Sequence, residues 1–306
     1  MNNKKFKKFL GFILFALIIV LIEFLDVTPK ELKTSIKSVN NQATKVEKRN
    51  IVDGTIEVSF IDVGQGDSIL IQTGDHSMLI DGGNNSDGKL LVEYFKSLGI
   101  KKFDYVVGTH PHEDHIGGLD NIISSFDIGT IYMPKVATTT KTFEDVLDVV
   151  KEKNLQIFTP SIGDKFYLGD AKVEVLSVKN DASDLNDTSI VLRLEYGNVS
   201  YIFMGDASTK IEKELLNKNI ESDVLKVGHH GSEYSTDINF LKKVNPKYAI
   251  ISVGENNIYD HPKTETLEKL ESLNIETYRT DELGTIKTIS DGNDIKFSYE
   301  RTDTNG

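Results

Sequence analysis

One short segment, residues 110–115, constrains what this chain can fold into more than any other. It reads His-Pro-His-Glu-Asp-His and places four possible metal ligands within six residues: His110, His112, Asp114 and His115. The apolar residues 105–107 before it indicate a buried strand, and two glycines at 117 and 118 follow. A tight loop at a strand end can aim these side chains at one point, which predicts a metal site there.

The composition limits which metal site this can be. The 306-residue chain has no cysteine, so histidine and carboxylate side chains have to bind any metal. These ligands suit zinc, manganese or iron. A hydrophobic content of 39% is ordinary for a packed domain, and we expect one large domain after the N-terminal region.

Three other apolar strands end in residues of the same chemistry. Asp81 follows the first of them, Asp206 the second, and His229 with His230 the third. An aspartate beside glycine is by itself more typical of a turn or a helix cap. Together with the 110–115 cluster, however, these residues predict one site assembled from several strand ends.

Two further segments are candidates for the surroundings of this site. Residues 64–68, Gly-Gln-Gly-Asp-Ser, lie between two expected strands and can present backbone N–H groups to an anion, which makes Gln65 and Asp67 site candidates. His261 precedes an amphipathic helix and is a candidate for contacting the substrate or stabilising a leaving group. A surface or capping role for His261 is the alternative.

From residue 55 onward, short β-rich runs alternate with amphipathic stretches, which is typical of sheets covered by helices. Turns at Gly74-Asp75 and Gly197-Asn198 predict hairpins, and therefore mixed sheets. We expect strands at residues 56–60, 68–72, 78–80, 105–109, 130–133, 173–178, 190–195, 200–204, 224–227 and 248–253. We expect helices at residues 89–98, 142–153, 209–217, 238–244 and 264–273.

The N-terminal residues indicate a membrane anchor. Four lysines between residues 4 and 8 precede an uninterrupted apolar run, residues 9–22, without a small-residue cleavage site after it. We expect an uncleaved signal anchor at 1–25, a polar stalk at 26–54 and a hydrolase domain at 55–306, outside the cytoplasm. Without the four lysines the chain has 31 basic and 47 acidic residues, a formal charge of −16, which disfavours strong nonspecific nucleic-acid binding.

The motifs together resemble those of the metallo-β-lactamase superfamily, and most of all the ComEC/Rec2-like hydrolase domain of competence proteins, which is related to phosphorylcholine esterases. The resemblance extends from about residue 56 to the end of the chain. It is carried by residues 62–68, 81–83, 110–115, 204–206, 228–232 and 261–262.

This resemblance implies an αββα sandwich with two divalent metal ions, zinc or manganese, at one edge. It implies that His110 and His112 bind the first metal, that Asp114, His115 and His230 bind the second, and that Asp206 bridges both. His229 would face the substrate. Asp81 would orient a ligand histidine, without indicating which one.

The chain departs from the superfamily at one point. A further histidine usually binds the first metal before the bridging aspartate, but residues 185–189 read Leu-Asn-Asp-Thr-Ser. Asn186, Asp187 or an extra water would then fill that position, which favours a weaker, more manganese-tolerant first site.

The expected function is metal-dependent hydrolysis of a phosphodiester, with in-line attack of an activated water on phosphorus. The catalytic candidates are Asp114, His229 and His261, the two histidines as proton donors to the departing alkoxide. The expected substrates are DNA or cell-envelope phosphodiesters, and the sequence indicates no protein partner. The alternatives are β-lactam or thioester hydrolysis and a metal-binding module without turnover.

Overall fold

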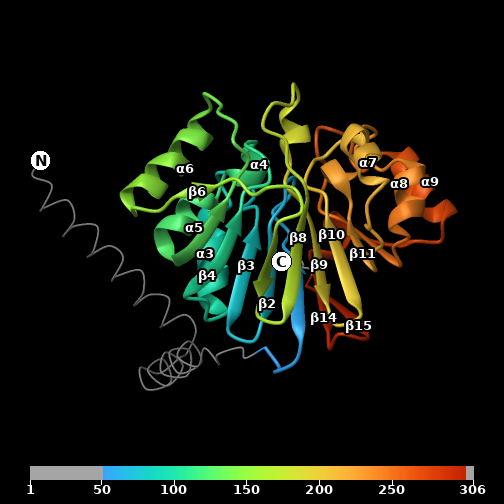
Figure 1. Cartoon of the computed structure of the whole chain (residues 1–306), viewed down its shortest axis with the longest axis horizontal. Helices are drawn as coiled ribbons and strands as arrows, with labels where there is room; N and C mark the ends of the chain where they lie inside the picture. Colours follow the sequence, from blue (N-terminus) through green and yellow to red (C-terminus); the bar gives the residue numbers. More distant parts are fainter. Residues whose placement is uncertain (1–50, 301–306) are drawn as a thin grey trace, which may run out of the picture. The chain divides into compact units, whose positions relative to one another are not determined.

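Two mixed β-sheets pack face to face at the centre of the computed structural model, which describes residues 51–300 (Figure 1). The predicted anchor at 1–25 lies outside the described residues, as does the predicted stalk up to residue 50. Within residues 51–300, no helix has both the length and the apolarity needed to cross a bilayer.

The first sheet has eight strands in the order β15-β14-β1-β2-β3-β4-β5-β6. Their bounds are β1 Ile56–Phe60, β2 Ile69–Thr73, β3 His76–Ile80, β4 Lys102–Val107, β5 Asp127–Tyr132, β6 Ile157–Phe158, β14 Thr285–Ser290 and β15 Ile295–Glu300. The pairs from β15 to β3 are antiparallel, whereas β3, β4, β5 and β6 run parallel.

The second sheet has seven strands in the order β13-β12-β11-β10-β9-β8-β7. Their bounds are β7 Lys165–Leu168, β8 Ala171–Ser177, β9 Val191–Tyr196, β10 Val199–Phe203, β11 Val224–Lys226, β12 Tyr248–Ile251 and β13 Glu276–Arg279. Strands β10 to β13 are parallel, and β7 to β10 are antiparallel. The two predicted hairpins are therefore confirmed, since β2 pairs with β3 and β9 with β10 in antiparallel register.

Helices cover the outer face of each sheet. The bounds are α3 Gly88–Ser97, α4 Glu113–Ile116, α5 Leu119–Ser125, α6 Lys141–Glu152, α7 Thr209–Leu215, α8 Ile238–Val244, α9 Thr264–Ser272 and α10 Thr280–Leu283, with single 3₁₀ turns η1 Leu185–Thr188 and η2 Gly228–Gly231. Helix α6 shows why these segments are helical. The Thr140 hydroxyl accepts from the Phe143 amide at its start, and Phe143, Val146 and Val150 form its buried stripe.

Three apolar clusters hold the layers together. One lies between the sheets and joins side chains such as Phe60 and Ile71 of the first sheet to Leu192 and Tyr201 of the second. A second cluster lies between the first sheet and helices α3, α5 and α6, and a third between the second sheet and helices α7, α8 and α9. The result is the predicted αββα sandwich, with helices α3 and α6 on one side and α7 and α8 on the other (Figure 1).

All ten predicted strands and all five predicted helices are present, with bounds shifted by a few residues. The prediction missed strands β6, β7, β13, β14 and β15 and helices α4, α5 and α10. Helix α4 matters most for the site, because it places Asp114 and His115 in a short helix, where the sequence predicted a tight loop.

Candidate metal centre

The ends of strands from both sheets supply the site. Asp81 follows β3, and the 110–115 segment follows its parallel neighbour β4. Asp206 follows β10 in the second sheet, and His230 lies in the turn η2 after the parallel strand β11. Parallel strands end at the same edge of a sheet, so this topology collects residues that are far apart in the sequence.

Four of the predicted ligands form a compact group. The ligand atoms of Asp114, His115, Asp206 and His230 all lie within 4.8 Å of one another. Asp206 Oδ1 is 3.2 Å from His115 Nε2 and 3.5 Å from His230 Nε2. His230 Nε2 is also 3.4 Å from Asp114 Oδ2. Two imidazoles and two carboxylates around one point match a zinc or manganese site.

The second oxygen of Asp206 faces other histidines. Asp206 Oδ2 lies 3.8 Å from His110 Nε2 and 3.7 Å from His229 Nε2. His110 Nε2 in turn lies 3.0 Å from His112 Nδ1. The two carboxylate oxygens of Asp206 thus face different sets of imidazoles, which is the arrangement that a bridging ligand requires.

Hydrogen bonds fix the orientation of both histidines in the compact group. His115 Nδ1 donates to Asp81 Oδ2 over 2.8 Å, and Asp81 also accepts from the amide and hydroxyl of Thr109. His230 Nδ1 donates to the backbone carbonyl of Ser252 over 2.9 Å. Each ring therefore carries a proton on Nδ1 and presents Nε2 to the carboxylates. The histidine that Asp81 holds, which the sequence left open, is His115.

The electrostatics of the group favour a cation. Burial lowers the pKa of His115, but Asp206, Asp114 and Asp81 raise that pKa well above its usual value. Burial also lowers the pKa of His230, which Asp206 and Asp114 raise by a larger amount. The carboxylates therefore create a strongly negative potential at both rings, for which protons and metal ions compete.

Buried polar atoms in this group lack well-formed hydrogen bonds. They are Nε2 of His115, Nε2 of His230 and Oδ1 of Asp206. Leaving such atoms unpaired in the interior costs free energy. A metal ion among them would use all three lone pairs, so the residues present fit a bound cation.

Asn186 and Asp187, the two candidates for the missing histidine, differ in their surroundings. Asn186 lines the cavity, and its buried Oδ1 has no hydrogen-bond partner. Asp187 Oδ1 instead accepts from the Ser208 hydroxyl over 2.6 Å. The geometry thus favours Asn186 over Asp187 as the residue whose side-chain oxygen would bind the first metal beside His110 and His112.

The glycine-rich segment 64–68 packs behind the site. A Cβ on Gly66 would lie 2.4 Å from the carbonyl oxygen of Asp114, so only glycine fits there. The amide of Asp67 donates to that same carbonyl, and the amide of Gly64 donates to Asp62 Oδ1. The sequence suggested that this segment presents its N–H groups to an anion, but these two N–H groups are already bonded within the protein. The segment instead supports the backbone of Asp114.

Lys226 is a residue that the sequence analysis missed. It is fully buried at the end of β11, and its Nζ lies 2.8 Å from Asp67 Oδ2. Asp67 Oδ1 is 3.5 Å from His230 Nδ1. A lysine inside the apolar run Val224-Leu225-Lys226-Val227 was the available signal, because lysine is almost never fully buried unless it is paired.

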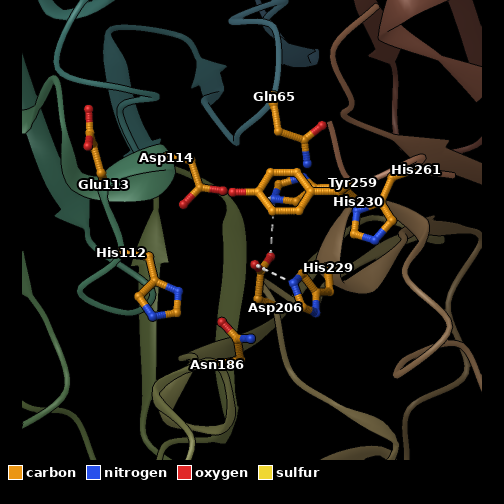
Figure 2. A pocket seen from close by; sticks show the side chains of 10 residues that line it. All are labelled: Gln65, His112, Glu113, Asp114, Asn186, Asp206, His229, His230, Tyr259 and His261. Atoms are coloured by element: carbon orange, nitrogen blue, oxygen red, sulfur yellow. Dashed lines mark ion pairs between the residues drawn. The ribbon is translucent and has the colours of Figure 1, made fainter. Parts of the chain in front are cut away.

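A cavity of about 360 Å³ opens over the site (Figure 2). The residues that line it are Gln65, His112, Glu113, Asp114, Asn186, Asp206, His229, His230, Tyr259 and His261. Burial lowers the pKa of His229 and lowers that of His261 to about 4, so both rings are neutral near pH 7. These shifts do not support the expected role of either histidine as an imidazolium proton donor. As neutral rings, both can still contact a substrate.

Comparisons with known proteins agree with this geometry. Residues 61–255 match the metallo-beta-lactamase superfamily. The chain is 35% identical over 252 residues to ComE operon protein 3 of Bacillus subtilis, an alignment that covers 76% of this chain and 32% of that protein. The chain thus spans about a third of the length of this relative, whose similarity is consistent with the ComEC/Rec2-like branch.

Two further similarities concern a nuclease and a solved structure. The chain is 29% identical over 121 residues to exodeoxyribonuclease YycJ of Bacillus anthracis, covering 39% of this chain and 43% of that protein. The structure of Igni18, a metallo hydrolase of Ignicoccus hospitalis, matches with a TM-score of 0.52 at 17% identity over 76% of this chain and 98% of that one. The latter similarity shows a shared fold.

Proposed function

The chain belongs to the metallo-β-lactamase superfamily and is a metal-dependent hydrolase, and from this premise we propose that it hydrolyses phosphodiesters. The observation that carries the proposal is Asp206, whose two oxygens face different sets of histidines at the floor of an open cavity. A two-metal arrangement of this kind suits phosphoryl transfer, where charge develops on attacking and leaving oxygens together.

The proposed metal ligands are those of the compact group and its neighbours. Asp114, His115 and His230 would hold one ion, His110, His112 and Asn186 the other, and Asp206 would contact both. Bound ions of this kind supply an activated water and neutralise charge on phosphate oxygens. The protein contributes the fixed Nε2 orientation of His115 and His230, set by Asp81 and Ser252.

Two substrate classes fit the proposed phosphodiesterase. The name of the exodeoxyribonuclease from Bacillus anthracis supports a nucleic acid, as does the similarity to a ComE operon protein. The acidic composition and the proposed position outside the cytoplasm support a cell-envelope phosphodiester. A β-lactam or thioester substrate is disfavoured, because residues 185–189 lack the histidine usual at the first metal.

The experiment that tests the function is a substrate screen with the purified full-length protein. After loading with zinc or manganese, we expect hydrolysis of bis(p-nitrophenyl) phosphate, and we expect its loss after treatment with a chelator and its recovery on adding the metal back. Nitrocefin serves as the β-lactam control. Hydrolysis of nitrocefin without turnover of any phosphodiester would contradict the proposal, and metal binding without turnover of either would indicate a module that only binds.

We also propose that the protein is retained in the membrane with its hydrolase domain outside the cytoplasm. The support is the lysine cluster before the apolar residues 9–22, without a cleavage signal after them. Protease added to intact, wall-stripped cells should then digest the domain. A full-length chain that stays protected in such cells would exclude this topology, and a shortened form found only in the medium would exclude the anchor.

A further inference from the structure

An exposed aromatic ring lies at the mouth of the cavity. Tyr259 lines the cavity, yet its side chain is 55% exposed. Figure 2 shows its ring among Gln65, Asp114 and His261, above the floor formed by Asp206. A large aromatic side chain that stays exposed at the entrance of a site offers a face for stacking.

The loop that carries Tyr259 is held by one side chain. Asn257 Nδ2 donates to the carbonyls of Gly254 and His261, and Asn257 Oδ1 accepts from the amides of Tyr259 and His261. The loop is also tied to the glycine-rich segment, since the amide of Gly254 donates to Gln65 Oε1 over 3.3 Å. The ring is thus pre-positioned, which reduces the entropy cost of binding a ligand against it.

Tyr259 begins a series of rings that leads to the proposed metal ligands. Its ring is stacked on that of His261, with centroids 5.8 Å apart and planes 26° apart. His261 meets His229 edge to face over 5.7 Å, and His229 Nε2 lies 3.7 Å from Asp206 Oδ2. These three rings therefore form a continuous row from the mouth of the cavity to Asp206, along which the sugar of a nucleotide could separate a base at Tyr259 from a phosphate at Asp206.

We infer that Tyr259, supported by His261, is a stacking platform for a nucleobase beside the scissile phosphodiester. The inference rests on the phosphodiesterase function proposed above and deepens it by naming a nucleotide as the substrate class. Stacking on an aromatic side chain tolerates any base, because every base has a π-face. It also needs no basic groove, which reconciles a nucleotide substrate with the formal charge of −16 that remains outside the predicted cytoplasmic tail.

The cavity fits a planar base better than a quaternary ammonium such as choline. Binding of a quaternary ammonium uses several electron-rich ring faces arranged as a cage. Among the described residues that line the cavity, Tyr259 is the single phenyl-type ring, and the other rings are imidazoles. One exposed face with a second ring stacked behind it is the arrangement that a flat base requires.

The test compares two phosphodiesters with the metal-loaded full-length protein. One is the dinucleotide of two thymidines, and the other is the same compound with both bases replaced by hydrogen. Tyr259→Ala should lower kcat/KM for the dinucleotide about 5- to 150-fold, the range typical for loss of one base-stacking ring, and should change the value for the abasic compound less than about twofold. Tyr259→Phe should restore most of the activity, since it keeps the ring.

Tyr234→Ala is the matched control, because Tyr234 is 66% exposed and does not line the cavity. It should leave both rates unchanged.

Equal losses on the two compounds in Tyr259→Ala would overturn the inference. Turnover of p-nitrophenyl phosphorylcholine that is faster than turnover of the dinucleotide and depends equally on Tyr259 would also overturn it. If bis(p-nitrophenyl) phosphate is hydrolysed but neither the dinucleotide nor the abasic compound is, the inference fails and the phosphodiesterase function stands. If no phosphodiester is hydrolysed, the proposed function fails first.

Discussion

Asp206→Ala is expected to lower kcat/KM for bis(p-nitrophenyl) phosphate at least about 10³-fold, because Asp206 is, within residues 51–300, the one carboxylate that faces both sets of histidines. Its removal would also weaken metal binding. We expect the purified variant to retain clearly less zinc or manganese after desalting than the unchanged protein. Metal content measured by mass spectrometry, together with initial rates at several metal concentrations, checks both effects.

Asp187→Ala is the matched control for this variant. Asp187 is also a buried aspartate at the edge of the second sheet, 4% exposed, but its carboxylate bonds to Ser208. We expect Asp187→Ala to keep its metal and to lose far less activity than Asp206→Ala. If both variants lose similar, small amounts of activity and keep the same metal content, Asp206 is an ordinary turn residue and the proposed two-metal site is wrong.

The candidate site could be predicted from the sequence to the extent that local motifs carry it. His110, His112, Asp114 and His115 lie within six residues, and Asp81 and Asp206 each follow an apolar strand, so residue type and position were enough to nominate them. The pairings between them were not predictable. Asp81 bonds to His115, and Asp187 bonds to Ser208 instead of facing the site. Both contacts join residues more than 20 positions apart in the sequence.

Strand β14 shows why a strand can be missed from the sequence. In β14, apolar Ile286 and Ile289 alternate irregularly with Thr288 and the buried Lys287, so the run lacks the clean two-residue period of a strand. Its strand character comes from pairing with β1, about 230 residues earlier in the chain. The place of Tyr259 at the cavity was also not predictable from a local sequence pattern. It depends on the hydrogen bonds of Asn257, which hold the loop.

Lys226→Met is expected to destabilise the domain by about 3–5 kcal/mol, because it leaves the carboxylate of Asp67 buried without its cation. Both side chains of this pair are no more than 1% exposed, so solvent cannot compensate the charge that remains. For a domain of this size, such a loss lowers the melting temperature by roughly 6–20 °C. Thermal unfolding followed by circular dichroism measures the change.

Two further variants show whether the buried charge is the cause. Lys247→Met removes an exposed lysine that lies 3.1 Å from Asp223, a surface pair that contributes about 0–1 kcal/mol, so its melting temperature should hardly change. The double variant Lys226→Met with Asp67→Asn removes both charges and should recover a large part of the lost stability. If the double variant is less stable than Lys226→Met alone, the lysine contributes through packing and not through its ion pair.

The same pair should affect the metal site, because Asp67 joins Lys226 to two of the proposed ligands. Its amide donates to the carbonyl of Asp114, and its carboxylate lies 3.5 Å from His230 Nδ1. Supports of this kind typically change metal affinity 10- to 100-fold, so we expect the double variant to regain stability but to bind zinc more weakly than the unchanged protein. Zinc titration of the folded double variant separates the two roles. Unchanged zinc affinity there would limit the Lys226–Asp67 pair to a role in folding.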